Sequence, residues 1–256
     1  MQVSVIAVVV LEILLMVGLP VAAVLVVGRR WSQPLRLALA GAATFVASQL
    51  VHIPANSILA QAFDMASQPL WIQAVVLGLS AGVFEEVARY LVFRFWQKDA
   101  RSWRDAAFMG LGHGGIEAIL IGVLVALTLL NMVVIARVDD PATLGLPQEA
   151  LAQVEAFWSM PLYLPLLAAA ERVMAIVLHM SLSTLVVLCF RQARIWPLVA
   201  AILWHALGNA VTVYAAQTWG DVAAEGVLAV VALLSLGLLR LTRRALADVP
   251  PSGAEV

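Results

Sequence analysis

Charged residues are scarce in this sequence of 256 residues, because Asp, Glu, Lys and Arg together make up only 12%. Soluble domains carry about twice that share, roughly 25%. Hydrophobic residues reach 63%, so too little polar material is present to form a hydrated shell around an apolar core. The surroundings of this chain must therefore be lipid. Soluble enzymes and disordered proteins are excluded at once.

Two further shortages narrow the possible functions. The chain has a single cysteine, Cys189, which excludes an internal disulfide framework, a zinc ribbon and a Cys-x-x-Cys redox motif. Its formal net charge is −1, so it lacks the basic excess that accompanies nucleic-acid binding. We therefore expect the chain to contact a lipid bilayer and to bind no nucleic acid.

Long hydrophobic runs, in contrast, are abundant. A helix needs about 20 mostly apolar residues to cross a bilayer. Seven windows reach that length, namely 3–27, 36–60, 70–95, 106–136, 162–190, 196–217 and 222–239. The sequence thus predicts an all-α fold, a polytopic membrane helical bundle with about seven transmembrane helices.

The windows leave little sequence for any other domain. We expect a single membrane domain over residues 1–244 and a flexible cytoplasmic tail over 245–256. The acidic segment 137–161 is the only long connection between windows, and we expect it to be a loop.

Basic residues predict how the bundle is oriented. Of the 15 Lys and Arg, 12 follow the first, third, fifth and seventh windows, whereas the opposite loops hold only Arg137. Lys and Arg concentrate in cytoplasmic loops. We therefore expect the N-terminus outside and the C-terminus in the cytoplasm.

Ionisable residues inside the windows carry the functional information, because each of them is costly in lipid. Several form pairs four residues apart, which places both members on one face of a helix. These pairs are Glu85–Arg89, His113–Glu117, His179–Ser183 and His205–Asn209. A polar stripe facing lipid would be unstable, so we expect all four stripes to face one interior.

The depth of these groups supports a shared site. At about 1.5 Å per helical residue, Glu85, His113, His179 and His205 all lie roughly 14 to 18 Å from the nearest cytoplasmic basic residue. This common layer predicts one cavity, which we expect to open towards the cytoplasmic half. Glu86 adds a second carboxylate beside the single Arg89. One of the two acids therefore has no compensating charge and is available as a general base.

Other polar positions have simpler interpretations. Glu171 and Arg172 lie roughly 28 to 30 Å from the cytoplasmic reference, where a local interfacial ion pair accounts for them. His52, together with Pro54 and Asn56, indicates a helix kink with a local hydrogen bond. The glycines within 110–115 favour close helix packing over a turn that binds an oxyanion.

The order of these motifs resembles the YhfC family of intramembrane proteases. That family belongs with PrsW and the CAAX- and bacteriocin-processing (CPBP) membrane proteases, and more distantly with the Aph-1 scaffold of γ-secretase. The resemblance covers about residues 80–212 and rests on four motifs in order. They are Glu-Glu-x-x-Arg from Glu85, Gly-x-Gly-His-Gly-Gly-x-Glu around His113, Glu-Arg with the downstream His179, and His-x-x-x-Asn from His205.

The resemblance implies a function and a location. It implies an integral protein of the bacterial cytoplasmic membrane that cleaves a peptide bond of a membrane or membrane-associated protein. In such enzymes one glutamate of the first motif activates water, and the later His and Asn residues position water or stabilise the oxyanion. The catalytic set implied here is Glu85, Glu86, Arg89, His113, Glu117, His179, His205 and Asn209.

The sequence leaves several alternatives open. Three histidines and Glu117 could hold a zinc ion with Glu85 as base. The absence of His-Glu-x-x-His favours a glutamate mechanism without a cofactor. The second motif also lacks the Phe-x-x-x-His usual in CAAX-type enzymes, so their substrate is not carried over. A proton-coupled transporter and a non-catalytic Aph-1-like scaffold are the rival functions, and the oligomeric state stays undetermined.

Overall fold

The seven predicted spans are confirmed. The computed structural model describes residues 2–138 and 145–247, and these form helices without a strand. Seven helices among the described residues are long and apolar enough to cross a membrane. They are α1 (Val3–Trp31), α2 (Leu35–Ala62), α3 (Leu70–Leu91), α4 (Trp103–Ile135), α6 (Leu164–Gln192), α7 (Trp196–Trp219) and α8 (Asp221–Ala247).

Shorter elements connect these spans. A 3-10 turn, η1 (Met65–Ser67), precedes α3, and a π-helical turn, η2 (Val92–Trp96), continues it. The segment expected as a loop over 137–161 contains a helix, α5 (Gln148–Ser159), and that part of the prediction was wrong. With only 12 residues and none of them buried, α5 is too short to produce a membrane-length window.

The C-terminal boundary of the membrane domain also differs from the expectation. Helix α8 continues to Ala247, so residues 245–247 are helical rather than the start of a tail. The remainder of the expected tail, 248–256, lies outside the described residues.

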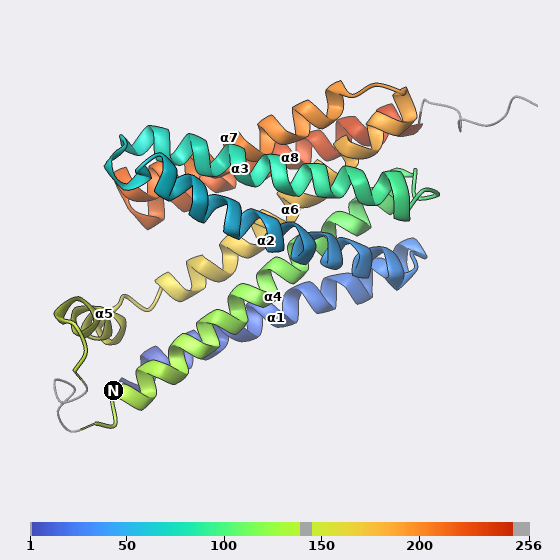
Figure 1. The fold of residues 1–256 in the computed structure, drawn as a ribbon. Coiled ribbons are helices and arrows are strands. Elements are labelled where there is room, and N and C mark those ends of the chain that lie inside the picture. Colours follow the sequence, from blue (N-terminus) through green and yellow to red (C-terminus); the bar gives the residue numbers. More distant parts are fainter. Residues whose placement is uncertain (1, 139–144, 248–256) are drawn as a thin grey trace, which may run out of the picture.

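The spans alternate in direction, which gives the bundle two chemically different ends. Helices α1, α6 and α8 and the η2 turn finish at what we name the basic end, where 12 of the 15 Lys and Arg gather. The other end, where α3, α6 and α8 begin, is named the acidic end. In Figure 1, α3, α7 and α8 lie together, α1 and α4 lie side by side below them, and α2 and α6 cross between the two groups.

The outer surface suits a bilayer. Large apolar side chains project from several helices, including Leu50 of α2 at 73% exposure and Leu233 of α8 at 66%. In water such a surface would drive aggregation, whereas in lipid it has no comparable cost. The chain is therefore an integral membrane protein that crosses the bilayer several times.

Glycines bring the site-bearing helices into close contact. A Cβ atom at Gly112 of α4 would collide with the backbone of Ala38 in α2, and one at Gly41 of α2 would meet the backbone of Met109. A Cβ at Gly110 would lie 2.5 Å from the backbone oxygen of His179 in α6. The stretch around His113 is continuous α-helix. The packing interpretation of these glycines is therefore confirmed.

The pair α3–α7 is built in the same way. Cβ atoms at Gly78 and Gly82 of α3 would meet backbone atoms of Ala206 and Ile202 in α7. Small residues allow helix backbones to approach closely in membranes. This approach brings polar side chains of α3, placed one turn beyond Gly82, within hydrogen-bonding distance of α7.

Candidate metal and catalytic site

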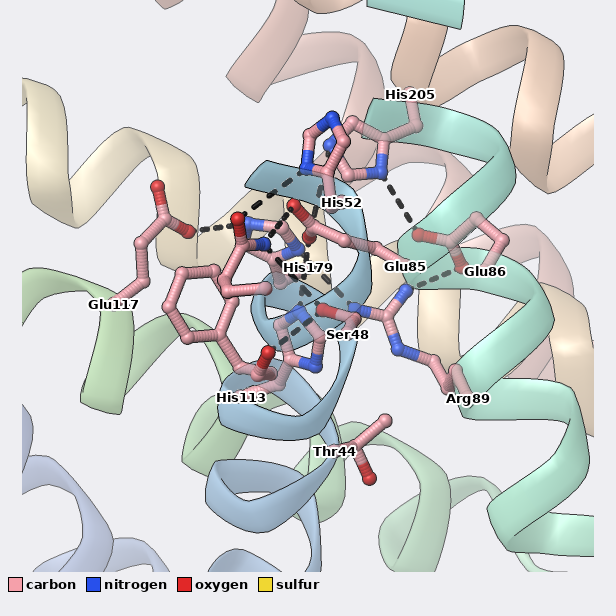
Figure 2. Close-up of polar contacts among 12 residues, drawn as sticks. Thr44, Ser48, His52, Glu85, Glu86, Arg89, His113, Glu117, His179 and His205 are labelled. Atoms are coloured by element: carbon pink, nitrogen blue, oxygen red, sulfur yellow. Dashed lines mark hydrogen bonds and ion pairs between the residues drawn. The ribbon is translucent and has the colours of Figure 1, made fainter. Parts of the chain in front are cut away.

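Four helices bring the predicted polar stripes together, as the common depth indicated. The imidazole ring centroids of His113 and His179 lie 4.8 Å apart, and those of His179 and His205 lie 5.3 Å apart. Glu85 approaches His113 to 3.0 Å, measured from Oε2 to Nε2. Figure 2 shows these side chains converging from α3, α4, α6 and α7.

A fully buried ion pair supports one side of the site. Glu86 and Arg89 are both 0% exposed and form an ion pair one turn apart on α3. The second oxygen of Glu86, Oε1, lies 2.9 Å from Nδ1 of His205. Since a carboxylate only accepts, Nδ1 of His205 must carry the proton. In the neutral imidazole, Nε2 of His205 then carries the lone pair, 4.0 Å from Glu85 Oε2.

Glu85 is held from two sides. Its Oε1 accepts a hydrogen bond from Nε2 of Gln49 in α2 at 3.1 Å, and its Oε2 faces His113. His113 is 0% exposed, and its Nδ1 has no hydrogen-bond partner among the described residues. His113 therefore supports Glu85 from within the bundle.

His179 bridges the buried pair and a second carboxylate. Arg89 lies 3.2 Å from Nδ1 of His179, and because arginine only donates, that nitrogen accepts. Nε2 of His179 then donates to Glu117 at 2.7 Å. The other oxygen of Glu117 accepts from Arg172 at 3.0 Å. Arg172 also pairs with Glu171. The local pair was predicted correctly, but its separation from the site was wrong, because Arg172 reaches Glu117 across the α4–α6 interface.

A cavity of about 200 Å³ adjoins this network. Its wall includes Glu85, Glu117, His179, His205 and Asn209. The three remaining members of the predicted set are not part of that wall; they are the fully buried Glu86, Arg89 and His113.

The direction of the cavity differs from the expectation. Its wall shares Glu171, Thr212 and Val213 with a second cavity of about 370 Å³, which Asp221 and Glu225 also line. The two cavities therefore follow one another towards the acidic end of the bundle. The prediction that the cavity opens towards the half with the basic loops was wrong. The second cavity lies beside the first turns of α8, and α8 begins at the acidic end.

Some polar residues of the interior were missed or underrated by the sequence. Gln49 contacts Glu85 directly, and His52 and Asn56 do form the expected local hydrogen bond, at 3.0 Å. Gln49, His52 and Asn56 are three and four residues apart, the same stripe spacing that identified the other helices. Glu12 of α1 was overlooked as well and is buried at 6% exposure.

The donor set fits a metal ion. One ligand atom each from Glu85, His179 and His205 lies within 4.8 Å of the others. Ligand atoms on a tetrahedral zinc lie roughly 3.3 Å apart, so side-chain shifts on the order of 1 Å would bring all three onto one ion. His179 would at the same time give up its bond to Arg89 or to Glu117, so that one ring nitrogen has a lone pair for the metal.

The charge of the network also favours a metal ion. The connected network holds four carboxylates and two guanidinium groups, so its formal charge is −2 with neutral histidines. A divalent cation would balance that charge.

The comparisons with known proteins show the family. Residues 13–232 match the family model described as YhfC intramembrane metalloprotease. The chain is also 33% identical over 203 residues to the uncharacterized membrane protein YhfC of Bacillus subtilis (strain 168), covering 75% of this chain and 77% of that protein. No solved structure matches. The wider likeness to PrsW and CPBP proteases stays a prediction. Because the family model matches most of its length, the chain belongs to the YhfC intramembrane metalloprotease family.

Proposed function

We propose that this protein hydrolyses a peptide bond of a membrane or membrane-associated protein, at a site where Glu85, His179 and His205 hold a zinc ion. The observation that carries the proposal is the mutual approach of three buried donor atoms within 4.8 Å. Two histidines and one glutamate are the protein ligands of zinc peptidases of the thermolysin type, where a fourth position stays open. The adjoining cavity gives substrate and water a place beside those ligands.

The metal would supply one part of the chemistry. Glu85, His179 and His205 would hold a zinc ion that would supply Lewis-acid chemistry at the peptide carbonyl. Glu86 prepares His205 for this role, because it fixes the proton on Nδ1 and leaves Nε2 free to bind. Carboxylates that orient a metal-binding histidine in this way are common in zinc sites.

Glu117 is the best candidate for the general base. Its side chain is 20% exposed and lines the cavity, so it can reach a water molecule there. Glu86 cannot, because it is fully buried and both of its oxygens are engaged. Arg172 holds one oxygen of Glu117. The other oxygen, which accepts from His179, would exchange that bond for one to the attacking water before it takes the proton.

Asn209 completes the proposed machinery. It lies one helical turn after His205 on α7 and lines the same cavity. Its side-chain amide can donate a hydrogen bond to the oxyanion that forms when water adds to the peptide carbonyl. Removal of one such donor typically costs about 10²–10³-fold in rate.

This proposal replaces the metal-free mechanism that the sequence favoured. In that mechanism Glu85 or Glu86 would be the base, and zinc would play no part. The free Nε2 of His205, turned towards Glu85, is the feature that favours a metal ligand role for Glu85.

The experiment begins with substrate trapping. The Glu85→Gln variant, expressed in the native host, should cause membrane proteins to accumulate uncleaved, and mass spectrometry of the membranes would identify them. The matched control is Glu149→Gln, which removes an exposed carboxylate on α5. If wild type and Glu85→Gln leave the same membrane proteins intact, the protein is not a protease.

Metal analysis of the purified protein then separates the two mechanisms. We expect about one zinc per chain in wild type and in Glu149→Gln, and loss of zinc in Glu85→Gln and His205→Ala. Glu117→Gln should keep its zinc and lose about 10²–10⁴-fold in cleavage rate. Cleavage of the trapped substrate that survives complete chelation would overturn the metal role and leave Glu85 as the base.

A further inference from the structure

We infer that Gln49 of α2 is a positioning residue for Glu85, and that His52 and Asn56 hold Gln49 in the required orientation. None of the four motifs includes these residues. The inference rests on the proposed role of Glu85 as a metal ligand. It assigns α2, which contributes no ligand, a direct part in building the site.

The hydrogen-bond directions follow from the carboxylate outwards. Glu85 only accepts when ionised, so the group of Gln49 that faces Oε1 must be its amide N–H, at 3.1 Å. The amide oxygen of Gln49 then faces Nδ1 of His52 at 3.3 Å, and Nδ1 must carry the proton. Neutral His52 therefore presents Nε2 as an acceptor.

Two more residues continue the chain in the same direction. The side-chain N–H of Asn56 donates to Nε2 of His52 at 3.0 Å. The amide oxygen of Asn56 accepts from the hydroxyl of Ser80 on α3. Every donor from Ser80 to Gln49 thus points towards Glu85. Aligned hydrogen bonds of this kind polarise one another, which strengthens the last bond in the series.

The chain decides which oxygen of Glu85 is available. With Oε1 occupied by Gln49, Oε2 is the atom that faces His113 at 3.0 Å and His205 at 4.0 Å. Without Gln49 the carboxylate could rotate about its last bond and withdraw Oε2 from the imidazoles. Gln49 therefore determines which oxygen of Glu85 faces the imidazoles, rather than where α3 lies in the bundle.

The surroundings keep this chain in place. His52 is buried at 8% exposure, and its ring stacks on Phe84, the residue before Glu85, with ring centroids 5.3 Å apart. Water therefore has little access to replace the bond between His52 and Gln49. A reversed amide at Gln49 would direct its oxygen at the carboxylate of Glu85, and the stacked His52 opposes that reversal.

The expected magnitude comes from comparable zinc sites. Loss of a residue that orients a metal ligand typically lowers metal affinity or activity about 10–100-fold. A residue needed only for helix packing would instead change stability and leave the zinc affinity of the folded protein unchanged. Zinc affinity, measured by competition with a chromophoric chelator in detergent, separates these two roles without any substrate.

The variants are chosen to keep the shape of the site. Gln49→Leu removes the donor, and Gln49→Glu keeps the length but turns an oxygen towards Glu85. His52→Ala removes the residue that orients Gln49, whereas His52→Asn restores an N–H near the place of Nδ1. The matched control is Gln61→Leu, an exposed glutamine at the end of the same helix.

We expect zinc affinity to fall about 10–100-fold in Gln49→Leu and at least as far in Gln49→Glu. His52→Ala should also weaken binding, His52→Asn should recover most of it, and the control should match wild type. If wild type binds zinc and the folded Gln49 variant binds it equally well, the inference is wrong while the proposed function stands. If Gln49→Leu does not fold, Gln49→Glu decides by the same criterion. If wild type binds no zinc, the proposed metal site itself fails.

Discussion

The buried pair of Glu86 and Arg89 should stabilise the whole bundle, and its disruption is the sharpest stability test that the structure offers. Both side chains are 0% exposed. Glu86→Gln keeps the shape of the side chain but leaves the guanidinium of Arg89 in the interior without its counter-charge. Arg89 also donates to His179, so the perturbation acts where three helices meet.

The magnitude follows from the asymmetry of buried ion pairs. Removal of one partner typically costs about 3–5 kcal/mol, because the remaining charge stays buried and uncompensated. Replacement of both partners by apolar residues of similar volume is often neutral or stabilising. We therefore expect Glu86→Gln to lose about 3–5 kcal/mol, and the double variant Glu86→Met with Arg89→Met to regain most of that loss.

The measurement is the free energy of unfolding in mixed detergent micelles, obtained by titration with sodium dodecyl sulfate. The exposed-site control Glu149→Gln should stay within about 0.5 kcal/mol of wild type. The double variant should be folded but unable to bind zinc normally, because His205 loses the acceptor that fixes its proton. A loss below about 1 kcal/mol in Glu86→Gln would refute the idea that this variant leaves the charge of Arg89 buried and uncompensated.

Three further predictions concern packing, the base and the topology. Gly112→Ala should cost about 1–3 kcal/mol in unfolding free energy, because the new methyl group meets the backbone of α2; Gly226→Ala, which opens onto free space, should cost nothing in the same titration. Arg172→Leu should slow cleavage of a trapped substrate about 10–100-fold while zinc content stays at wild-type level. Reporter fusions at residues 100 and 145 should score cytoplasmic and external respectively, and the reverse pattern would overturn the orientation expected from the basic residues.

Helices and polar stripes were predictable because both follow from local chemistry. Lipid offers no hydrogen bonds to a bare backbone, so runs of about 20 apolar residues must become helices. A charged residue in such a run must face the interior, and a partner four residues away shares its face. Glu85 and His205 were therefore placed correctly at a common depth. The short α5 escaped notice because a helix outside the bilayer needs no such run.

The division of roles between Glu85 and Glu86 was beyond the sequence. Neighbouring residues on a helix point about 100° apart, so either one could have faced the cavity. The close packing of α3 on α7 decided it, since His205 and Arg89 cover Glu86 and leave Glu85 on the cavity wall.

The same dependence on packing explains the other differences. Gln49 is uncharged, so its position in a membrane helix did not by itself indicate a function. Its role is visible only in the packing of α2 on α3, which places Gln49 against Glu85. Arg172 lies several residues from His179 along α6 and joins the site only because α4 places Glu117 beside it. The direction of the cavity depends on where α8 begins relative to α6 and α7. Sequence determined which residues had to be hidden from lipid, whereas only the packing of the helices decided which of them meet.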